Sequence, residues 1–212
     1  MTTLPPASPR PWLRIWTHPR ATVRELLGHS PLYVELLLVA GSGVIQSIVQ
    51  GMSNHVGARL PGFIILLGTL VIGTLWGLLQ LHVIATPLYY VGKWTGAPAR
   101  FRDLRTALAW AAIPQVAILP FWLLGTLVFG RFLYVEPELA LARMPLAVLA
   151  QGLLSLATLL CSGWWLVLQV FTVAEVQGVS AWRGLGNLFA AVAMIAVAVV
   201  LVVFVVLVFL RH

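Results

Sequence analysis

The sequence predicts an all-α polytopic membrane protein, with a single bundle of five transmembrane helices and an N-terminal amphipathic helix on the membrane surface. Two observations carry this prediction. Of the 212 residues, 60% are hydrophobic and only 9% are charged, whereas soluble domains have about 45–50% apolar and about 25% charged residues. The chain also contains five apolar runs that each reach the roughly 20 helical residues a bilayer core requires. A soluble globule of this composition would lack the charges to cover its surface.

The five runs form one predicted transmembrane domain, residues 31–212, and lie at about 32–52, 62–91, 107–129, 146–173 and 188–210. The second and fourth runs are longer than a bilayer needs, so we expect these helices to tilt or to end in an interfacial turn. The fifth run has no polar side chain. We therefore expect it at a lipid-facing edge or at an interface between protomers.

Prolines and glycines predict the shape and packing of the first three spans. Pro87 lies near the end of the second run, and Pro114 and Pro120 lie in the third. Each proline removes a backbone N–H and clashes with the preceding turn, so we expect kinks there. The sequences AGSG (40–43) and GTLWG (73–77) place small residues in the first and second runs, and such residues let helix backbones approach closely. The first two spans should therefore be in contact.

Residues 1–30 form a separate predicted segment that precedes the first span. The sequence TVRE fits a capping box, with Thr22 as the N-cap and Glu25 three positions later. Trp12 and Trp16 are residues typical of the headgroup interface. We expect residues 10–29 to lie as an amphipathic segment on the membrane surface, with its arginines in contact with anionic lipid.

The distribution of basic residues predicts the orientation. Nine lie on one side of the predicted spans, namely Arg10, Arg14, Arg20, Arg24, Lys93, Arg100, Arg102, Arg105 and Arg183; four lie on the other, namely Arg59, Arg131, Arg143 and Arg211. The positive-inside rule then places the N-terminus in the cytoplasm and the C-terminus on the opposite side. No signal peptide is apparent in the first 30 residues. Because the net charge of +7 is spread between apolar runs, it indicates lipid headgroups and topology and not a nucleic-acid partner.

Polar side chains at membrane depth are unfavourable unless they are satisfied, so each one is a candidate for function. The candidate intramembrane site comprises Glu35, Gln80, His82, Gln115, Gln169 and Glu175. The last five are expected to converge in the cytoplasmic half of the bundle. We expect His82 to bond to a neighbouring helix, with a proton-relay or ligand role as the alternative.

The two carboxylates and an outer glutamine pair have specific expected partners. Glu35 is expected to reach back to Arg24 or to water, and Glu175 to pair with Arg183 or with an arginine of the second loop. A buried functional carboxylate is the alternative for Glu35. Gln46 and Gln50 lie one turn apart in the first run and are expected to hydrogen-bond between helices.

Motifs of catalysis and of cofactor binding do not appear in the sequence. There is no HExxH, GxSxG or phosphate-binding loop. The lone Cys161 lies in an apolar run without a nearby base, which predicts an inert thiol. The histidines other than His82 lie in loops or at the tail, so neither a metal site nor a cofactor is expected.

Three motifs resemble those of the Yip family, whose name refers to interaction with Ypt/Rab GTPases, and of its bacterial members in particular. They are IWTHPRATVRELL (15–27), FRDLRTALAWAAIP (101–114) and AEVQGVSAWRGLGNL (174–188). The resemblance implies five spans with a cytoplasmic N-terminus, a role in membrane traffic or organisation, and homo- or hetero-complexes. This chain lacks the long N-terminal region and the tyrosine-glycine motifs of the eukaryotic members, so Rab binding does not carry over. The arginine bias and compact loops are typical of a bacterial inner (cytoplasmic) membrane protein.

Three hypotheses for function follow. The first is a non-enzymatic membrane adaptor or organiser that binds a protein partner, another copy of itself or anionic lipid through the basic segments; the candidate residues are Arg20, Arg24, Arg100, Arg102, Arg105 and Arg183. The alternative is a transporter or channel for a small solute, ion or lipid at the inner polar cluster beside the proline kinks. An intramembrane enzyme would require Glu35, His82 and Glu175 to meet within hydrogen-bond reach.

Overall fold

A computed structural model describes residues 10–210, and every regular element in this part of the chain is a helix. The elements are α1 (Pro11–Arg14), α2 (Pro19–Leu26), α3 (Leu32–Ser53), η1 (Val56–Ala58), α4 (Gly62–Trp94), α5 (Phe101–Ala111), α6 (Ile113–Phe129), η2 (Gly130–Tyr134), α7 (Pro137–Arg143), α8 (Pro145–Val176) and α9 (Ala181–Leu210). Five helices, α3, α4, α6, α8 and α9, are long and apolar enough to cross a membrane. The predicted all-α class, with five spans and short N-terminal helices, is confirmed.

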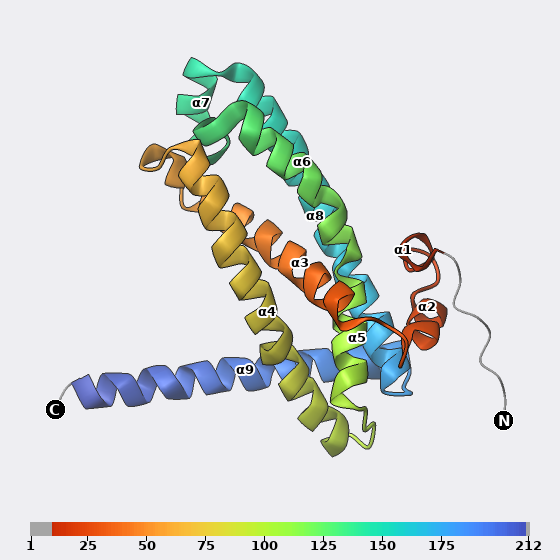
Figure 1. Ribbon diagram of the computed structural model, residues 1–212. Coiled ribbons are helices and arrows are strands. Elements are labelled where there is room, and N and C mark those ends of the chain that lie inside the picture. The colour runs from red at the N-terminus through yellow and green to blue at the C-terminus, as the bar shows by residue number, and fades with distance from the viewer. Residues whose placement is uncertain (1–9, 211–212) are drawn as a thin grey trace.

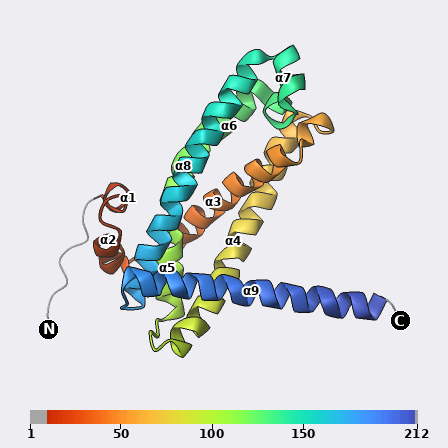
Figure 2. The same cartoon turned by 180° about the vertical axis from the view of Figure 1, so that it is seen from behind.

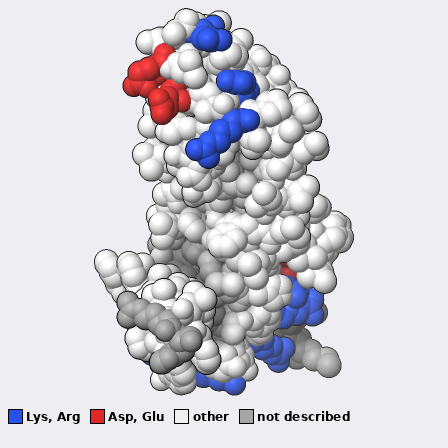
Figure 3. Space-filling view, turned by 90° about the vertical axis from the view of Figure 1, so that its left-hand side faces the viewer, with Lys and Arg blue, Asp and Glu red and all other residues white. Residues whose placement is uncertain are grey.

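Helices α3, α4, α6 and α8 run between two ends of the molecule (Figure 1). We call the end that holds α1, α2, α5 and the α8–α9 connection the basic end. We call the end that holds η1, η2 and α7 the opposite end. On the face drawn in Figure 3, the charged side chains gather at these two ends and leave an uncharged belt between them. This distribution is what a bilayer requires of a protein that crosses it.

The contact between α3 and α4 rests on three glycines, as the sequence predicts. A Cβ on Gly43 would lie 2.1 Å from the carbonyl oxygen of Gly73, and a Cβ on Gly77 would lie 2.0 Å from the carbonyl oxygen of Val39. These distances are too short for any side chain, so the two backbones touch directly. Helix α3 is the most buried of the five spanning helices.

The third apolar run is divided into two helices and is not one kinked span. Helix α5 ends at Ala111 and α6 begins at Ile113, so residues 107–111 belong to α5. Pro114 therefore lies in the first turn of α6, where a missing backbone N–H breaks no helical hydrogen bond. The candidate span that the structure contains here begins at Ile113 and extends through η2 to Tyr134.

The N-terminal helix begins earlier than the expected capping box. The N-cap of α2 is His18 and Pro19 is the first helical residue. Thr22 lies inside the helix, and its hydroxyl donates to the carbonyl oxygen of His18 at 2.8 Å. Glu25 pairs with Arg14 at 2.6 Å, which joins α2 to α1. The prediction of a Thr22 cap was wrong because a proline at the first helical position already sets the start of the helix.

Helix α9 differs in packing from the expected single bundle. Its first residues, up to Ala191, contain four buried positions and pack against α4 and α8. Beyond this point nearly every side chain is exposed, and α9 extends sideways across the other helices (Figures 1 and 2). The exposed part consists of apolar residues only, so lipid or another protein surface must cover it.

Candidate functional site

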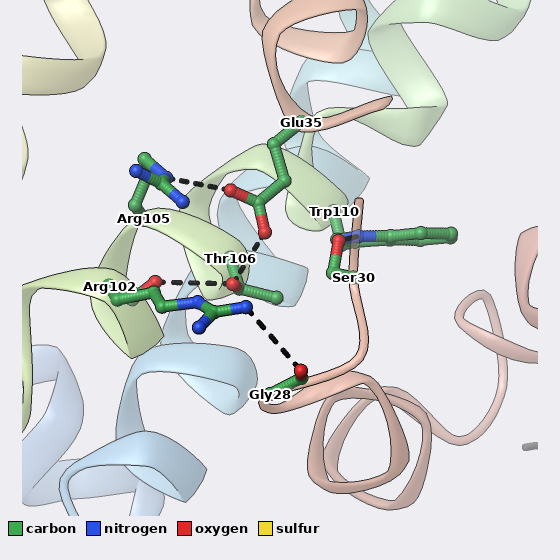
Figure 4. Close-up of polar contacts among 7 residues, drawn as sticks. All are labelled: Gly28, Ser30, Glu35, Arg102, Arg105, Thr106 and Trp110. Carbon is green, nitrogen blue, oxygen red and sulfur yellow. Dashed lines mark hydrogen bonds and ion pairs between the residues drawn. The ribbon is translucent and has the colours of Figure 1, made fainter. Parts of the chain in front are cut away.

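A buried ion pair lies where the first span enters the bundle. Glu35 is in the first turn of α3 and is fully buried. One carboxylate oxygen accepts from Nε of Arg105 at 2.7 Å, and the other accepts from the Thr106 hydroxyl at 2.6 Å. Both partners come from α5, which packs across the start of α3 (Figure 4). The expected partners of Glu35, Arg24 or water, were wrong.

The connection between α2 and α3 is held against the same helix. An Arg102 guanidinium nitrogen lies 3.4 Å from the carbonyl oxygen of Gly28, and the Trp110 indole N–H donates to the Ser30 hydroxyl at 2.9 Å (Figure 4). The ring of Trp12 lies 4.9 Å from that of Trp110. Helix α5 therefore holds the α2–α3 connection and the Trp12 ring of α1 through side chains spaced along it.

A second ion pair joins α2 to the end of α8. Arg24 and Glu175 approach to 2.6 Å, and the Arg24 side chain remains 66% exposed. Arg20 adds a contact at 3.5 Å with the carbonyl oxygen of Val179, and its guanidinium lies over the Phe171 ring. The expected partners of Glu175, Arg183 or an arginine of the second loop, were wrong. The arginine that reaches it comes from the N-terminal segment.

Arg183 ties the start of α9 to the end of α4. It donates to the carbonyl oxygen of Thr95 at 3.0 Å. Below it, Asn187 donates to Gln177 at 2.8 Å, and Gln177 donates to the carbonyl oxygen of Leu88 at 3.3 Å. Of the six candidate arginines, five thus have a polar partner within the described part of the chain. The sixth, Arg100, is exposed and makes no such contact there.

Deeper in the bundle, amide side chains form a chain of hydrogen bonds across three helices. Gln46 of α3 donates to Gln80 of α4 at 2.8 Å and accepts from the Trp76 indole at 3.0 Å. Ser42 donates to Gln115 of α6. Gln46 is therefore an interhelical hydrogen bonder, as expected. These contacts satisfy amides that would otherwise be unfavourable at membrane depth. The expectation of the same role for Gln50 was wrong, because its exposed side chain has no hydrogen-bond partner among residues 10–210.

A small cavity of about 30 Å³ adjoins this chain of hydrogen bonds. Its wall includes Ser42, Gln80 and Gln169. Gln169 therefore lies beside the same cavity as the hydrogen-bonded amides, although its side chain makes no direct hydrogen bond to them. A cavity of this size has room for about one or two water molecules. Of the side chains that the transport hypothesis invokes, Gln80 and Gln169 line this cavity, and its volume suits water and not a larger solute.

Two members of the expected inner cluster lie elsewhere. His82 is exposed on α4, and its Nδ1 atom lies 3.0 Å from the carbonyl oxygen of Leu78 in its own helix. The expected hydrogen bond from His82 to a neighbouring helix was therefore wrong. Glu175 is in the α2–α8 ion pair and Glu35 is in the pair with Arg105. The three residues that an intramembrane enzyme would need are therefore bound to different partners. Among residues 10–210, no three His, Cys, Asp or Glu side chains form a group that could hold a metal ion.

The family model of the Yip1 domain matches residues 13–208. The chain belongs to the Yip1 domain family. It is an integral membrane protein with five spans. No curated protein and no solved structure matches the chain.

The three motifs that suggested this family lie together in the Yip1-domain chain. The first supplies α2, the second supplies α5, and the third supplies the connection from α8 to α9. Contacts join them in a set: Arg24 with Glu175 links the first to the third, and Arg102 links the second to Gly28, directly after the first. The resembling residues therefore build one structural unit at the basic end of the Yip1 domain.

Several residues of this unit carry little signal in the sequence. Nothing in the sequence distinguishes Thr106, Ser30 and Trp110 from other polar and aromatic residues. Their roles become visible only when α5 is packed against the start of α3. Trp76 is more accessible to sequence reasoning, because it lies one helical turn before Gln80 and so shares a face with it. The same rule separates Gln80 from His82, since residues two apart on a helix do not face one another.

Proposed function

We propose that this Yip1-domain protein is a non-enzymatic membrane adaptor that binds anionic lipid headgroups and a protein partner at its basic end. The supporting observation is the assembly of three basic segments on one surface by contacts among themselves. Exposed guanidinium groups of Arg24, Arg100, Arg102 and Arg183 remain on that surface. Arginine forms bidentate hydrogen bonds with phosphate and carboxylate groups, which suits both kinds of ligand.

The proposal includes an orientation, with the basic end in the cytoplasm of a bacterial cell and the protein in its inner membrane. Nine basic residues lie at the basic end and three, Arg59, Arg131 and Arg143, lie at the opposite end. Arg211, the fourth residue assigned to that side, falls outside the described residues. Cytoplasmic leaflets are rich in anionic lipid, and each basic residue near such a surface contributes about 1 kcal/mol of attraction. With five spans, the C-terminus would then lie on the opposite side of the membrane from the basic end.

The adaptor proposal is favoured over transport by how the inner amides are used. Gln46, Gln80 and Gln115 each have a partner on another helix, and the adjoining cavity has a volume of about 30 Å³. Amides that hydrogen-bond from one helix to another stabilise helix packing. A transport site would instead present several of these groups to a substrate.

The experiment compares two matched pairs of substitutions in the full-length protein. R100Q/R102Q removes exposed charge at the basic end, and R131Q/R143Q removes the same charge at the opposite end. Cells that express each form are cross-linked, and the protein is purified in mild detergent for quantitative mass spectrometry. We expect a stoichiometric partner protein to be lost from R100Q/R102Q and retained by R131Q/R143Q. Equal recovery with both variants, at equal expression, would contradict the proposal.

A further inference from the structure

A groove opens between α3 and α4 in the half of the bundle that leads to the opposite end. Its volume is about 740 Å³, within the range of about 300–1,000 Å³ in which proteins hold small ligands. It begins where the glycine contact between the two helices ends. It is separate from the basic end and independent of the function proposed there.

The two walls of the groove differ in chemistry. Helix α4 contributes an apolar wall that includes Ile64, Gly68 and Ile72. Helix α3 and its C-cap residue contribute an amide stripe, Gln46, Gln50 and Asn54, at intervals of four residues. Residues at this spacing share a helix face, so the stripe follows the groove along its length. An apolar wall beside a row of hydrogen-bonding groups is complementary to an amphipathic ligand.

The stripe is satisfied at its deep end and open at its outer end. Gln46 bonds to Gln80 and receives the indole N–H of Trp76, which closes the base of the groove. Gln50 and Asn54 are exposed, and within residues 10–210 their side chains have no hydrogen-bond partner. Amides at this level of a membrane protein are unfavourable unless a ligand, headgroup or water satisfies them.

The length of the stripe fits one leaflet of a bilayer. Eight residues separate Gln46 from Asn54, which is about 12 Å along a helix axis, compared with a hydrocarbon core of about 30 Å. Asn54 is at the end of α3 and beside the α3–α4 loop, so the outer end of the groove is at the membrane interface. Ester carbonyls of a glycerolipid lie at that level, and its acyl chains lie below.

We propose that this groove binds one glycerolipid molecule of the surrounding leaflet. One acyl chain lies along the apolar wall of α4 down to Trp76. The amide N–H groups of Gln50 and Asn54 donate to the ester carbonyl oxygens. Lipid is the chosen occupant, in preference to a helix from a second copy, because the open amides offer donors at the depth of the esters and the exposed apolar half of α9 offers no acceptor side chain to them.

The test fills the groove without disturbing the backbone. An added Cβ at Gly68 meets no atom within 4 Å, and the same holds for Gly152 on the exposed face of α8. G68W therefore projects a large side chain into the groove, and G152W is a matched control with the same change in helix propensity. A second variant, Q50L, removes one donor and keeps the side chain close to its original size.

The protein is extracted from its membrane and the bound lipid is counted by native mass spectrometry, after cross-linking with a photoactivatable phosphatidylethanolamine. We expect one retained lipid per chain that cross-links to α3 and α4, is lost in G68W and is kept in G152W. For Q50L we expect retention about three- to tenfold weaker. Equal lipid retention in G68W and G152W would overturn the proposal. A lipid-free dimer that dissociates only in G68W would also overturn it, in favour of a second copy.

Discussion

The two ends of the bundle carry arginines in different settings. At the basic end, Arg14, Arg24 and Arg105 each hold a carboxylate at about 2.6–2.7 Å. At the opposite end Arg59, Arg131 and Arg143 are exposed, and the described residues show no ion pair for them or for Glu136 and Glu138. Both ends contain acids and bases, so the presence of opposite charges alone does not account for the ion pairs. What differs is that helices cross the basic end and bring the charges together.

This difference indicates that arginines at the basic end serve two purposes. Arg105 is largely buried and holds two helices together, whereas Arg100 is exposed and has no polar partner in the described structure. Arg24 has both properties, since it pairs with Glu175 and remains mostly exposed. Substitution of Arg105 should therefore lower the stability of the protein, whereas substitution of Arg100 should weaken binding at the basic end and leave stability nearly unchanged.

The largest effect on stability is expected from R105L. It leaves the Glu35 carboxylate buried without its charged partner, which destabilises proteins by about 3–5 kcal/mol. The unfolding transition of the purified protein in detergent, followed by tryptophan fluorescence, would show this loss. The matched change R131L at the opposite end should alter the transition by no more than about 0.5 kcal/mol. The double variant E35L/R105L should regain part of the lost stability, because no buried charge is left unpaired.

If R105L and R131L unfolded alike, the distinction between the two ends would fail for structural roles. If E35L/R105L were no more stable than R105L alone, the loss would come from packing and not from the unpaired carboxylate.

A smaller loss is expected from E175Q. Its partner Arg24 is mostly exposed, and solvent screening limits such pairs to about 0.2–1 kcal/mol. The same unfolding measurement at low and high salt would detect it, because salt should reduce the difference between E175Q and the unmodified protein. E138Q at the opposite end is the control and should show neither the loss nor the salt effect. A salt-independent loss in E175Q would mean that the ion pair does not contribute.

The smallest effect on stability is expected from R100Q. Its side chain is exposed and unpartnered in the described structure, and surface substitutions of this kind change stability by about 0.5 kcal/mol or less. The same variant should nevertheless weaken binding of the partner or of anionic lipid. A clear drop in the unfolding transition of R100Q would place Arg100 among the structural arginines and would remove the distinction within the cluster.

The fold was largely predictable because its strongest signals are local. Long apolar runs specify spans, and the glycines of AGSG and GTLWG indicate which two helices touch. The break at Ala112 was not predictable from hydropathy, since residues 107–111 are as apolar as the span that follows. Their placement depends on Arg105 and Thr106 binding Glu35, which is about 70 residues away in sequence.

The candidate site was predictable as a set of residues and not as a set of pairs. Counting arginines located the basic end, but the partner of Glu175 lies 151 residues earlier in the chain and depends on how α2 docks. Gln80 and His82 were predicted to share one cluster because they lie at a similar depth in the membrane, but depth does not specify which face of the helix each residue occupies. The rotation of about 100° per residue places them on opposite faces, which explains why one is bonded and the other is exposed.

The most direct test of the account measures the selectivity of the protein for anionic lipid in a reconstituted bilayer. Electron spin resonance of spin-labelled phosphatidylglycerol and phosphatidylcholine gives the fraction of each lipid that is immobilised at the protein. We predict a preference for phosphatidylglycerol that falls in R100Q/R102Q, persists in R131Q/R143Q, and weakens with added salt. Equal loss of preference in the two variants, or no preference in the unmodified protein, would contradict the claim that the basic end binds anionic lipid.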